Sequence, residues 1–348
     1  MLESTPAFVD GFGKRVVRRA SAAVALTEHL VFDPALARHA DFVAALKARV
    51  QRAQSLRLMS YAKVLRVDDD GVGGVSLVSE YVKGWRLADM LDVAESENLT
   101  LDIGVVMLLL RQLLPTAALL TTQSRDVASG ALGPEHLLLT PQGRVMPAEY
   151  VLGPAIEALA WTPDHLWRTL RVATPPTGAA GKAVSHRGDV AQLGITVLSL
   201  VVGRRLRDDE FPDRLEGLVE AARQRTPTVV DAPLSAGLRA WLLRALQLQT
   251  KSFATLFDAQ MALERLLTTE ASLLAQPSEL DVAMARLERF MPVFEAPEAP
   301  PEPVALPEVA VDDWAPPPPP PEMTPMAAVT REPKEEISLE AAVAIADR

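Results

Sequence analysis

The order of secondary-structure signals along the chain constrains its fold most strongly. Short β-rich runs, "KRVVRR", "AAVAL", "AKVLRV" and "GVSLVSEYV", are confined to residues 12–35 and 61–82. Between them, "DFVAALKARVQRAQSL" carries apolar residues every four positions, a spacing that predicts a helix. Helical patterns prevail from Leu99 onward and are broken only by a hairpin pattern within Gly130–Gly153. This order predicts an α+β protein in which a small β-rich lobe precedes a larger, mainly helical lobe.

A change of composition near Phe294 marks the end of the predicted globular part. Thirteen of the chain's 28 prolines follow it, and twelve Asp and Glu face three Lys and Arg between Glu295 and Arg348. Such a segment buries too little apolar surface to offset its ordering entropy. We therefore predict an N-lobe (1–82), a helical C-lobe (83–294) and a disordered, acidic, Pro-rich tail (295–348). The tail is predicted to be solvated, with docking through its final residues as the alternative.

Composition also excludes several classes of function. The chain has no Cys, and its five His are scattered without metal-ligand spacing, so thiol chemistry is excluded and no metal site is predicted. The tail holds nearly all of the net charge of −10, which leaves the body close to neutral, without the basic face that nucleic acid requires. The N-terminus has no apolar core typical of a signal peptide.

Two long apolar stretches are predicted to be core helices. Residues 103–120 are interrupted by Arg111, Gln112 and Pro115, and residues 190–203 are too few to cross a bilayer. The sequence therefore predicts no membrane span and a cytoplasmic protein.

Three ordered stretches carry the most specific motifs. They are "SLVSEYVKGWRLADML" (Ser76–Leu91), "GPEHLLLTPQGRV" (Gly133–Val145) and "HRGDVAQLGITVLSLVVGRRL" (His186–Leu206). In that order they resemble the interlobe hinge, the catalytic loop with its hairpin, and the anchoring helix of the bacterial serine/threonine protein kinase family. The resemblance covers most of residues 10–268 and implies a two-lobed protein-kinase-like fold.

The resemblance also implies what the hinge and the anchoring helix do. Ser79 falls at the gatekeeper position, and the backbones of Glu80 and Val82 would face an adenine as remnants of a nucleotide cleft. Asp189 and Gly194 fall where the anchoring helix carries its Asp and its packing Gly.

The positions that would carry chemistry hold unsuitable residues. Phosphoryl transfer needs a cation on the phosphates, metal ligands and a carboxylate near the attacking hydroxyl. By the resemblance, Thr27 stands at the phosphate-binding Lys, Ala131 at the proton-accepting Asp, Gly133 at the substrate-side Lys and His136 at the metal-binding Asn. Glu149 falls at the metal-binding Asp and alone retains a carboxylate. Each of these five positions is therefore predicted to be degenerate.

Two further elements depart from the family pattern. The helix that should supply an ion-pair partner for the phosphate-binding Lys has no Glu and offers Lys47 and Arg49 instead. The glycine-rich loop is reduced to Gly11 and Gly13, a pattern that also fits a simple turn before a strand.

Three hypotheses follow from this pattern. The first is a pseudokinase, an inactive kinase-like scaffold or regulatory domain that binds proteins through its large lobe or its tail. It needs no cofactor and retains at most vestigial ATP binding. The second is an atypical protein kinase or ATP-binding enzyme with a rearranged cleft that uses Glu149. The third is an unrelated helical binding domain, and a five-stranded small lobe beside a helical lobe would argue against it.

Overall fold

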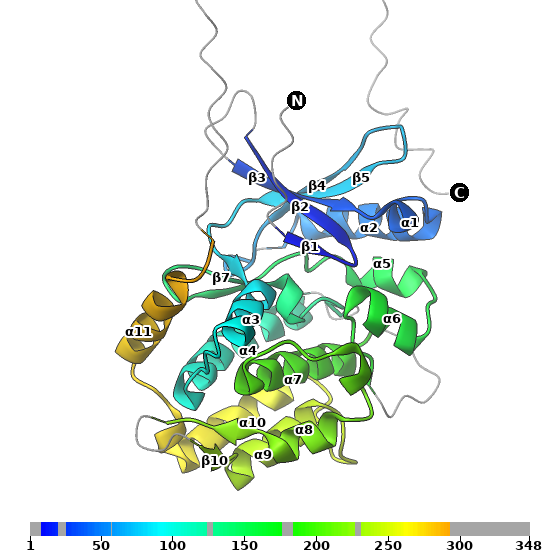
Figure 1. Cartoon of the computed structure of the whole chain (residues 1–348). Helices are drawn as coiled ribbons and strands as arrows, with labels where there is room; N and C mark the ends of the chain where they lie inside the picture. Colours follow the sequence, from blue (N-terminus) through cyan, green and yellow to red (C-terminus); the bar gives the residue numbers. More distant parts are fainter. Residues whose placement is uncertain are drawn as a thin grey trace, which may run out of the picture. The chain divides into compact units, whose positions relative to one another are not determined.

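The computed structural model describes residues 8–19, 26–56, 58–123, 128–175, 184–226 and 231–292. Within these residues a small lobe built around a β-sheet lies beside a larger helical lobe (Figure 1). The segment 295–348 lies outside the described residues, so the disordered tail stays a prediction.

Five antiparallel strands form the sheet of the small lobe. They are β1 (Phe8–Asp10), β2 (Gly13–Arg19), β3 (Leu26–Phe32), β4 (Val64–Asp69) and β5 (Val75–Glu80), in the spatial order β1-β2-β3-β5-β4. Arg15 pairs with Leu30, and Leu30 pairs with Leu77. Because side chains alternate between the faces of a sheet, Arg15 shares the inward face with these two buried leucines.

Two helices between β3 and β4 close the core of the small lobe. They are α1 (Pro34–Ala37) and α2 (Ala40–Ala53). The apolar face of α2 meets the sheet, where the Phe42 and Phe32 rings pack edge to face at 5.2 Å. The same core continues into Leu152 and into Ile156 of α5 (Gly153–Ala158), which packs against α2. The two lobes are therefore joined by shared apolar contacts.

The large lobe contains short strands, short 3₁₀ turns and the longer helices. In chain order they are β6 (Trp85–Arg86), α3 (Leu87–Ser96), α4 (Ile103–Gln123), η1 (Pro134–His136), β7 (Leu137–Leu139), β8 (Val145–Pro147), α5, α6 (Pro163–Leu170), α7 (His186–Val202), η2 (Asp208–Glu210), α8 (Leu215–Ala221), β9 (Arg223–Gln224), β10 (Ala232–Pro233), α9 (Ala236–Ala245), α10 (Leu256–Thr269), η3 (Ala271–Leu273) and α11 (Pro277–Glu288). Strands β6, β7 and β8 form a small sheet beneath the first one.

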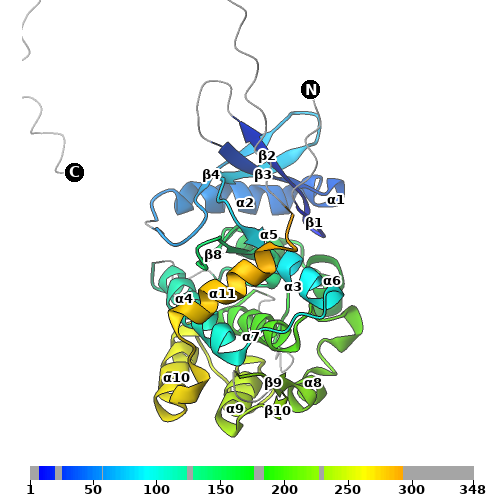
Figure 2. The same ribbon diagram turned by 60° about the vertical axis from the view of Figure 1, so that its left-hand side comes forward.

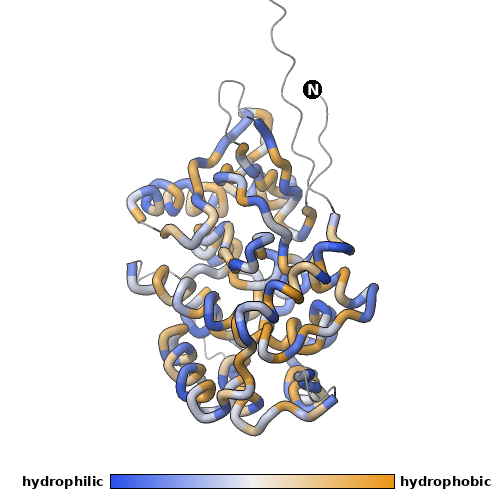
Figure 3. The backbone as a smooth tube through the Cα atoms, turned by 90° about the vertical axis from the view of Figure 1, so that its left-hand side faces the viewer, coloured by the Kyte–Doolittle hydropathy of each residue, from blue (hydrophilic) through white to orange (hydrophobic). Residues whose placement is uncertain are grey.

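Helices α4 and α7 form the centre of this lobe. By length and composition α4 could span a membrane, with a mean hydropathy of 1.9, but 67% of its most apolar window is buried inside the fold. It packs against α7, α10 and α11 (Figure 2), and the side chains of α7 are buried from Gly188 to Leu200. Figure 3 shows hydrophobic and hydrophilic positions interspersed along the elements of both lobes. The prediction that both stretches are core helices is confirmed.

Most predicted elements are present, and one strand continues beyond its predicted run. The runs "KRVVRR", "AKVLRV" and "GVSLVSEYV" form β2, β4 and β5, and the helix predicted between them is α2. The run "AAVAL" lies mostly outside the described residues, whereas β3 continues through "TEHLVF" to Phe32. Glu28 and His29 interrupt the apolar pattern there: Glu28 pairs with Arg86 of β6, and His29 Nε2 lies 3.1 Å from the hydroxyl of Thr27 in the same strand.

The two tryptophans of the segment after the hairpin pack within the large lobe. Trp167 is 3% exposed, stacks on Phe211 at 4.6 Å and donates its indole N–H to the Asp208 carbonyl. Trp161 is half-buried and contacts the His165 ring at 4.2 Å. Trp167 is therefore part of the core of the large lobe.

Candidate functional site at the junction of the lobes

Helix α7 fixes the loop that leads into η1 and β7. The two Asp189 carboxylate oxygens accept hydrogen bonds from the Ser129 and Gly130 N–H groups, each at 2.8 Å. Gln192 accepts from the Leu132 N–H at 2.9 Å and donates to the Gly130 carbonyl at 3.0 Å. These bonds satisfy backbone groups that would otherwise be buried without partners. Asp189 thus has the anchoring contacts that the sequence predicts.

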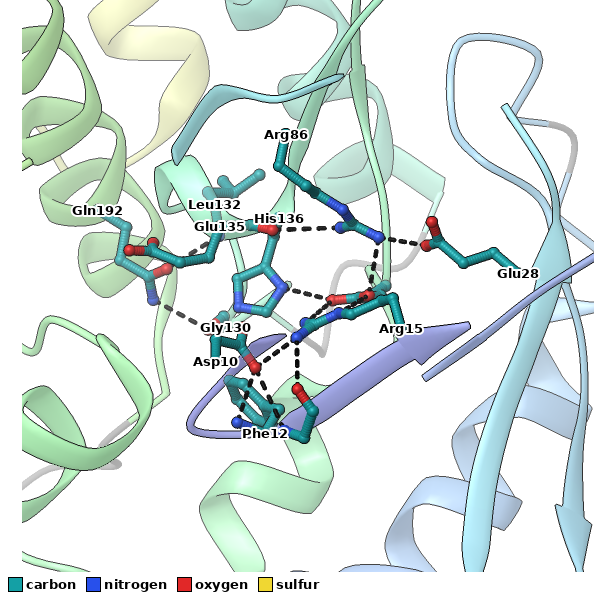
Figure 4. A network of polar contacts seen from close by, with 12 residues as sticks. Asp10, Phe12, Arg15, Glu28, Arg86, Gly130, Leu132, Glu135, His136 and Gln192 are labelled. Atoms are coloured by element: carbon teal, nitrogen blue, oxygen red, sulfur yellow. Dashed lines mark hydrogen bonds and ion pairs between the residues drawn. The ribbon is translucent and has the colours of Figure 1, made fainter. Parts of the chain in front are cut away.

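Six ionisable side chains meet where the two lobes join, and we call them the junction cluster: Asp10, Arg15, Glu28, Arg86, His136 and Glu149 (Figure 4). Strands β1, β2 and β3 supply the first three, and β6, η1 and the segment after β8 supply the others. The side chains of Arg15, Glu149 and Arg86 are only 0%, 2% and 3% exposed. Charged groups at this depth are stable only when they are paired.

The guanidinium of Arg15 is the inner cation of the junction cluster. Its Nε and Nη2 donate to Glu149 Oε1 and Oε2 at 2.9 and 2.8 Å, a bidentate pair. Its Nη1 forms an ion pair with Asp10 and donates to the Gly13 carbonyl at 3.3 Å. Arg15 therefore connects the β1–β2 hairpin to the segment after β8.

The guanidinium of Arg86 approaches the same carboxylate from the large lobe. Its Nη2 donates to Glu149 Oε1 at 3.1 Å and also forms an ion pair with Glu28. Its Nη1 donates to the Glu135 carbonyl at 3.2 Å. The Phe8 ring lies 5.9 Å from this guanidinium and 5.2 Å from that of Arg15, within the range of cation–π attraction.

His136 is the third group bound to Glu149. Its Nδ1 lies 2.6 Å from Glu149 Oε2. The Phe12 ring, itself fully buried, packs edge-on against the imidazole at 5.2 Å. The two oxygens of Glu149 are thus engaged by two guanidiniums and one imidazole.

The charges of the junction cluster stabilise one another. Burial acts to raise the pKa of Glu149, but Arg15, Arg86 and the hydrogen bond from His136 outweigh it and hold that pKa well below its usual range. Burial acts to lower the pKa of Arg15, and the nearby Glu149 and Asp10 carboxylates raise it above its ordinary value instead. Both groups are therefore charged at neutral pH.

The low pKa of Glu149 predicts an acid-dependent loss of stability. An ionised carboxylate with a depressed pKa stabilises the fold above its unfolded pKa, and that contribution is lost as the pH falls through the folded pKa. We expect the free energies of unfolding of wild type and Glu149→Gln to differ at pH about 7, and the difference to shrink as the pH is lowered from there into the acid range. Urea unfolding across this range measures it. A difference that does not change with pH would contradict the assignment.

Two of the predicted site residues, His136 and Glu149, come together in the junction cluster. Ala131 is fully buried in the apolar core. Gly133 precedes η1, and a Cβ there would lie 2.9 Å from Glu135 Oε2. No carboxylate stands at Ala131 and no cation at Gly133.

Thr27 and the hinge residues lie outside the cluster. The Thr27 hydroxyl lies 3.4 Å from the Arg18 carbonyl oxygen, to which it donates, and 3.1 Å from His29 Nε2. The residue of β3 that reaches the cluster is its neighbour Glu28, on the other face of the strand. The Glu80 N–H donates to the Lys63 carbonyl at 2.8 Å. Val82 packs on a small apolar group formed by Ala62, Leu138 and Ala148. An adenine-facing role for Glu80 and Val82 stays a prediction.

Sequence reasoning did not identify four cluster residues, Asp10, Arg15, Glu28 and Arg86. A usable signal was present, because the period of two along β2 and β3 places Arg15 and Glu28 on the face that carries the buried leucines. A charge at such a position requires a buried partner of opposite sign. Which partner it finds depends on the packing of the lobes.

The contacts of Glu149 do not fit a bound magnesium ion. A metal ligand must present a free carboxylate oxygen to the ion, yet those of Glu149 are held by Arg15, Arg86 and His136. Within the described ranges no group of three or more His, Asp or Glu is arranged to hold a metal ion. These contacts connect the small lobe to the large lobe.

The sheet lobe, the helical lobe and the hairpin between them define a protein-kinase-like fold. A crystal structure of the PknI kinase domain of Mycobacterium tuberculosis aligns with a TM-score of 0.52 and 16% sequence identity, covering 75% of this chain and 93% of that chain. A second crystal structure of that domain gives a TM-score of 0.52 and 16% identity over 74% and 92%. No family model and no curated protein matches the sequence. The likeness shows the fold alone and rules out the unrelated helical domain.

Proposed function

We propose that this chain is a pseudokinase, a kinase-like domain that transfers no phosphate and acts as a protein-binding scaffold or regulatory module. One observation carries the proposal. The carboxylate of Glu149, at the metal-binding position implied by the resemblance, is bound by Arg15, Arg86 and His136. To bind there, Mg²⁺ would have to displace these groups from a buried site in which the guanidiniums neutralise the charge of the Glu149 carboxylate.

The loss of the other catalytic groups supports the same proposal. Ala131 cannot accept a proton, and neither Thr27 nor Gly133 can neutralise phosphate charge. Asp189 and Gln192 hold the backbone of the loop in place. The loop therefore keeps its shape although it lacks the groups that phosphoryl transfer requires. Such a domain can bind proteins through the surface of its large lobe or through residues 295–348, and a cytoplasmic location belongs to this proposal.

Nucleotide binding tests the proposal directly. We expect the melting temperature to stay unchanged with millimolar ATP and Mg²⁺, since Arg15, Arg86 and His136 already bind the Glu149 carboxylate that Mg²⁺ would need. A ligand present at 100 times its dissociation constant would stabilise the fold by about 2.7 kcal/mol, a shift of several degrees. Such a shift, reproduced by isothermal calorimetry, would reject the proposal.

The alternative function is an atypical kinase or ATP-binding enzyme that uses Glu149. It is supported by the retained carboxylate of Glu149, whose pKa Arg15 and Arg86 hold well below its usual range. It requires that Arg15 leave the carboxylate and that incubation with labelled ATP yield a labelled product. Loss of labelling in Glu149→Ala, with labelling retained in the surface variant Glu264→Ala, would favour this alternative over the pseudokinase.

The choice between the two partner-binding regions needs its own experiment. Co-purification from the native source of the full chain and of a chain ending at residue 294 would compare them. Partners lost on truncation would assign binding to the tail, and partners retained would assign it to the large lobe.

A further inference from the structure

The turn between β1 and β2 lies directly against the last turn of α6. A Cβ built on Gly11 would lie 1.5 Å from the Thr169 carbonyl oxygen and 2.7 Å from the Thr169 carbonyl carbon. Only glycine permits two backbones to approach this closely. Figures 1 and 2 both show the β1–β2 hairpin reaching towards α6.

The same turn covers the junction cluster. Phe12, at its tip, is fully buried against His136, and its carbonyl accepts the Asp33 N–H at 2.8 Å. Asp10 Oδ1 accepts the N–H groups of Phe12 and Gly13 at 2.8 and 3.3 Å, which holds the turn in one shape. Lifting the turn would expose the Phe12 ring and draw Asp10 away from the Arg15 guanidinium.

Helix α6 contacts the turn and is also anchored in the large lobe, where Trp167 packs on Phe211 at 4.6 Å and donates its indole N–H to the Asp208 carbonyl. It is capped by Thr162, whose hydroxyl accepts the His165 N–H at 3.3 Å, and it ends at Arg171 in the left-handed conformation with φ 58°. Its inner side chains Leu166 and Leu170 belong to the same apolar cluster as Phe12. An opening of either element therefore removes apolar contacts from the other.

We propose that the β1–β2 turn and α6 form a latch that opens as one unit and controls access to the junction cluster. In the closed state the backbone contact at Gly11, the Phe12 ring and the Arg15–Glu149 pair act together. A displacement of α6 removes the support of the turn, so the small lobe loosens from the large one at the same time. The latch would regulate access to the junction cluster, and it rests on the proposed function, in which side chains and not a nucleotide fill this site.

Hydrogen exchange of the full chain tests the latch. Gly11→Ala places a methyl group against the Thr169 carbonyl, so we expect amides of both residues 11–15 and residues 163–170 to exchange at least about tenfold faster. Gly217→Ala in α8 is the matched control, because a Cβ there meets no atom within 4 Å, and it should leave both segments unchanged. Faster exchange confined to residues 11–15, or no change in either segment, would overturn the proposal.

Measurements on the wild type keep the proposal testable if Gly11→Ala does not fold. Under low urea, amides of the two segments should share one opening free energy and one dependence on urea, as a single cooperative unit does. Two distinct openings would refute the latch. Neither exchange experiment contains nucleotide. Binding of Mg-ATP would therefore reject the pseudokinase proposal and leave the latch untouched. Separate openings of the two segments would reject the latch and would not support the alternative of an active enzyme.

Discussion

Replacing Glu149 by Gln is expected to lower the free energy of unfolding by about 3–5 kcal/mol, because it leaves buried guanidiniums without their counter-charge. Arg15 loses its bidentate partner and Arg86 loses one of its two carboxylates. Gln has nearly the same shape as Glu, so the change reports on charge and not on a cavity. Equilibrium urea unfolding at neutral pH measures it.

The matched control is an ion pair on the surface. Arg111 and Glu264 form a pair at 2.9 Å with side chains 47% and 38% exposed. Glu264→Gln should cost less than about 1 kcal/mol, since solvent screens exposed charges. A Glu149→Gln variant no less stable than this control would mean that the junction cluster does not hold the lobes together.

A double variant separates the roles of charge and packing. Buried ion pairs can be replaced by apolar residues of similar size with little loss. Arg15→Met combined with Glu149→Leu should therefore be more stable than Glu149→Gln alone, although Arg86 would still have lost a partner. A double variant that is no more stable than Glu149→Gln would contradict this.

The second large effect is expected for Asp189→Ala. Its carboxylate accepts the buried Ser129 and Gly130 N–H groups, and each donor left without a partner costs about 1–3 kcal/mol. The free energy of unfolding should fall by roughly 2–6 kcal/mol. The exposed Asp213→Ala serves as the control and should change stability by less than about 0.5 kcal/mol.

The pH dependence of this effect has the opposite sign to that of Glu149. Burial, partly offset by its backbone hydrogen bonds, raises the pKa of Asp189 to about 6. A carboxyl group whose pKa is raised on folding stabilises the fold most at low pH and loses that contribution as the pH rises through its folded pKa. The cost of Asp189→Ala should therefore be larger at pH about 4 than at pH about 7. Equal costs at both values would contradict the assigned burial of this charge.

Local patterns were sufficient to predict much of the fold. Periodicity of two and of 3.6 places β2, β4, β5 and α2 correctly, and interrupted apolar runs are enough to assign α4 and α7 to the core. The continuation of β3 to Phe32 was not predicted, because Glu28 and His29 break the apolar alternation. The Glu28 side chain pairs with Arg86 of β6, a contact between distant parts of the chain that no local pattern contains.

The sequence predicted which catalytic groups the site lacks, but it did not predict the junction cluster. The sequence alone determined that Ala131, Gly133 and Thr27 hold neither carboxylate nor cation, because the identity of a side chain fixes its chemistry. Only the tertiary structure decided that Arg15 and Arg86, from different lobes, close on Glu149. That pairing depends on which strand faces turn inward and on how the lobes meet, and both are set by long-range packing.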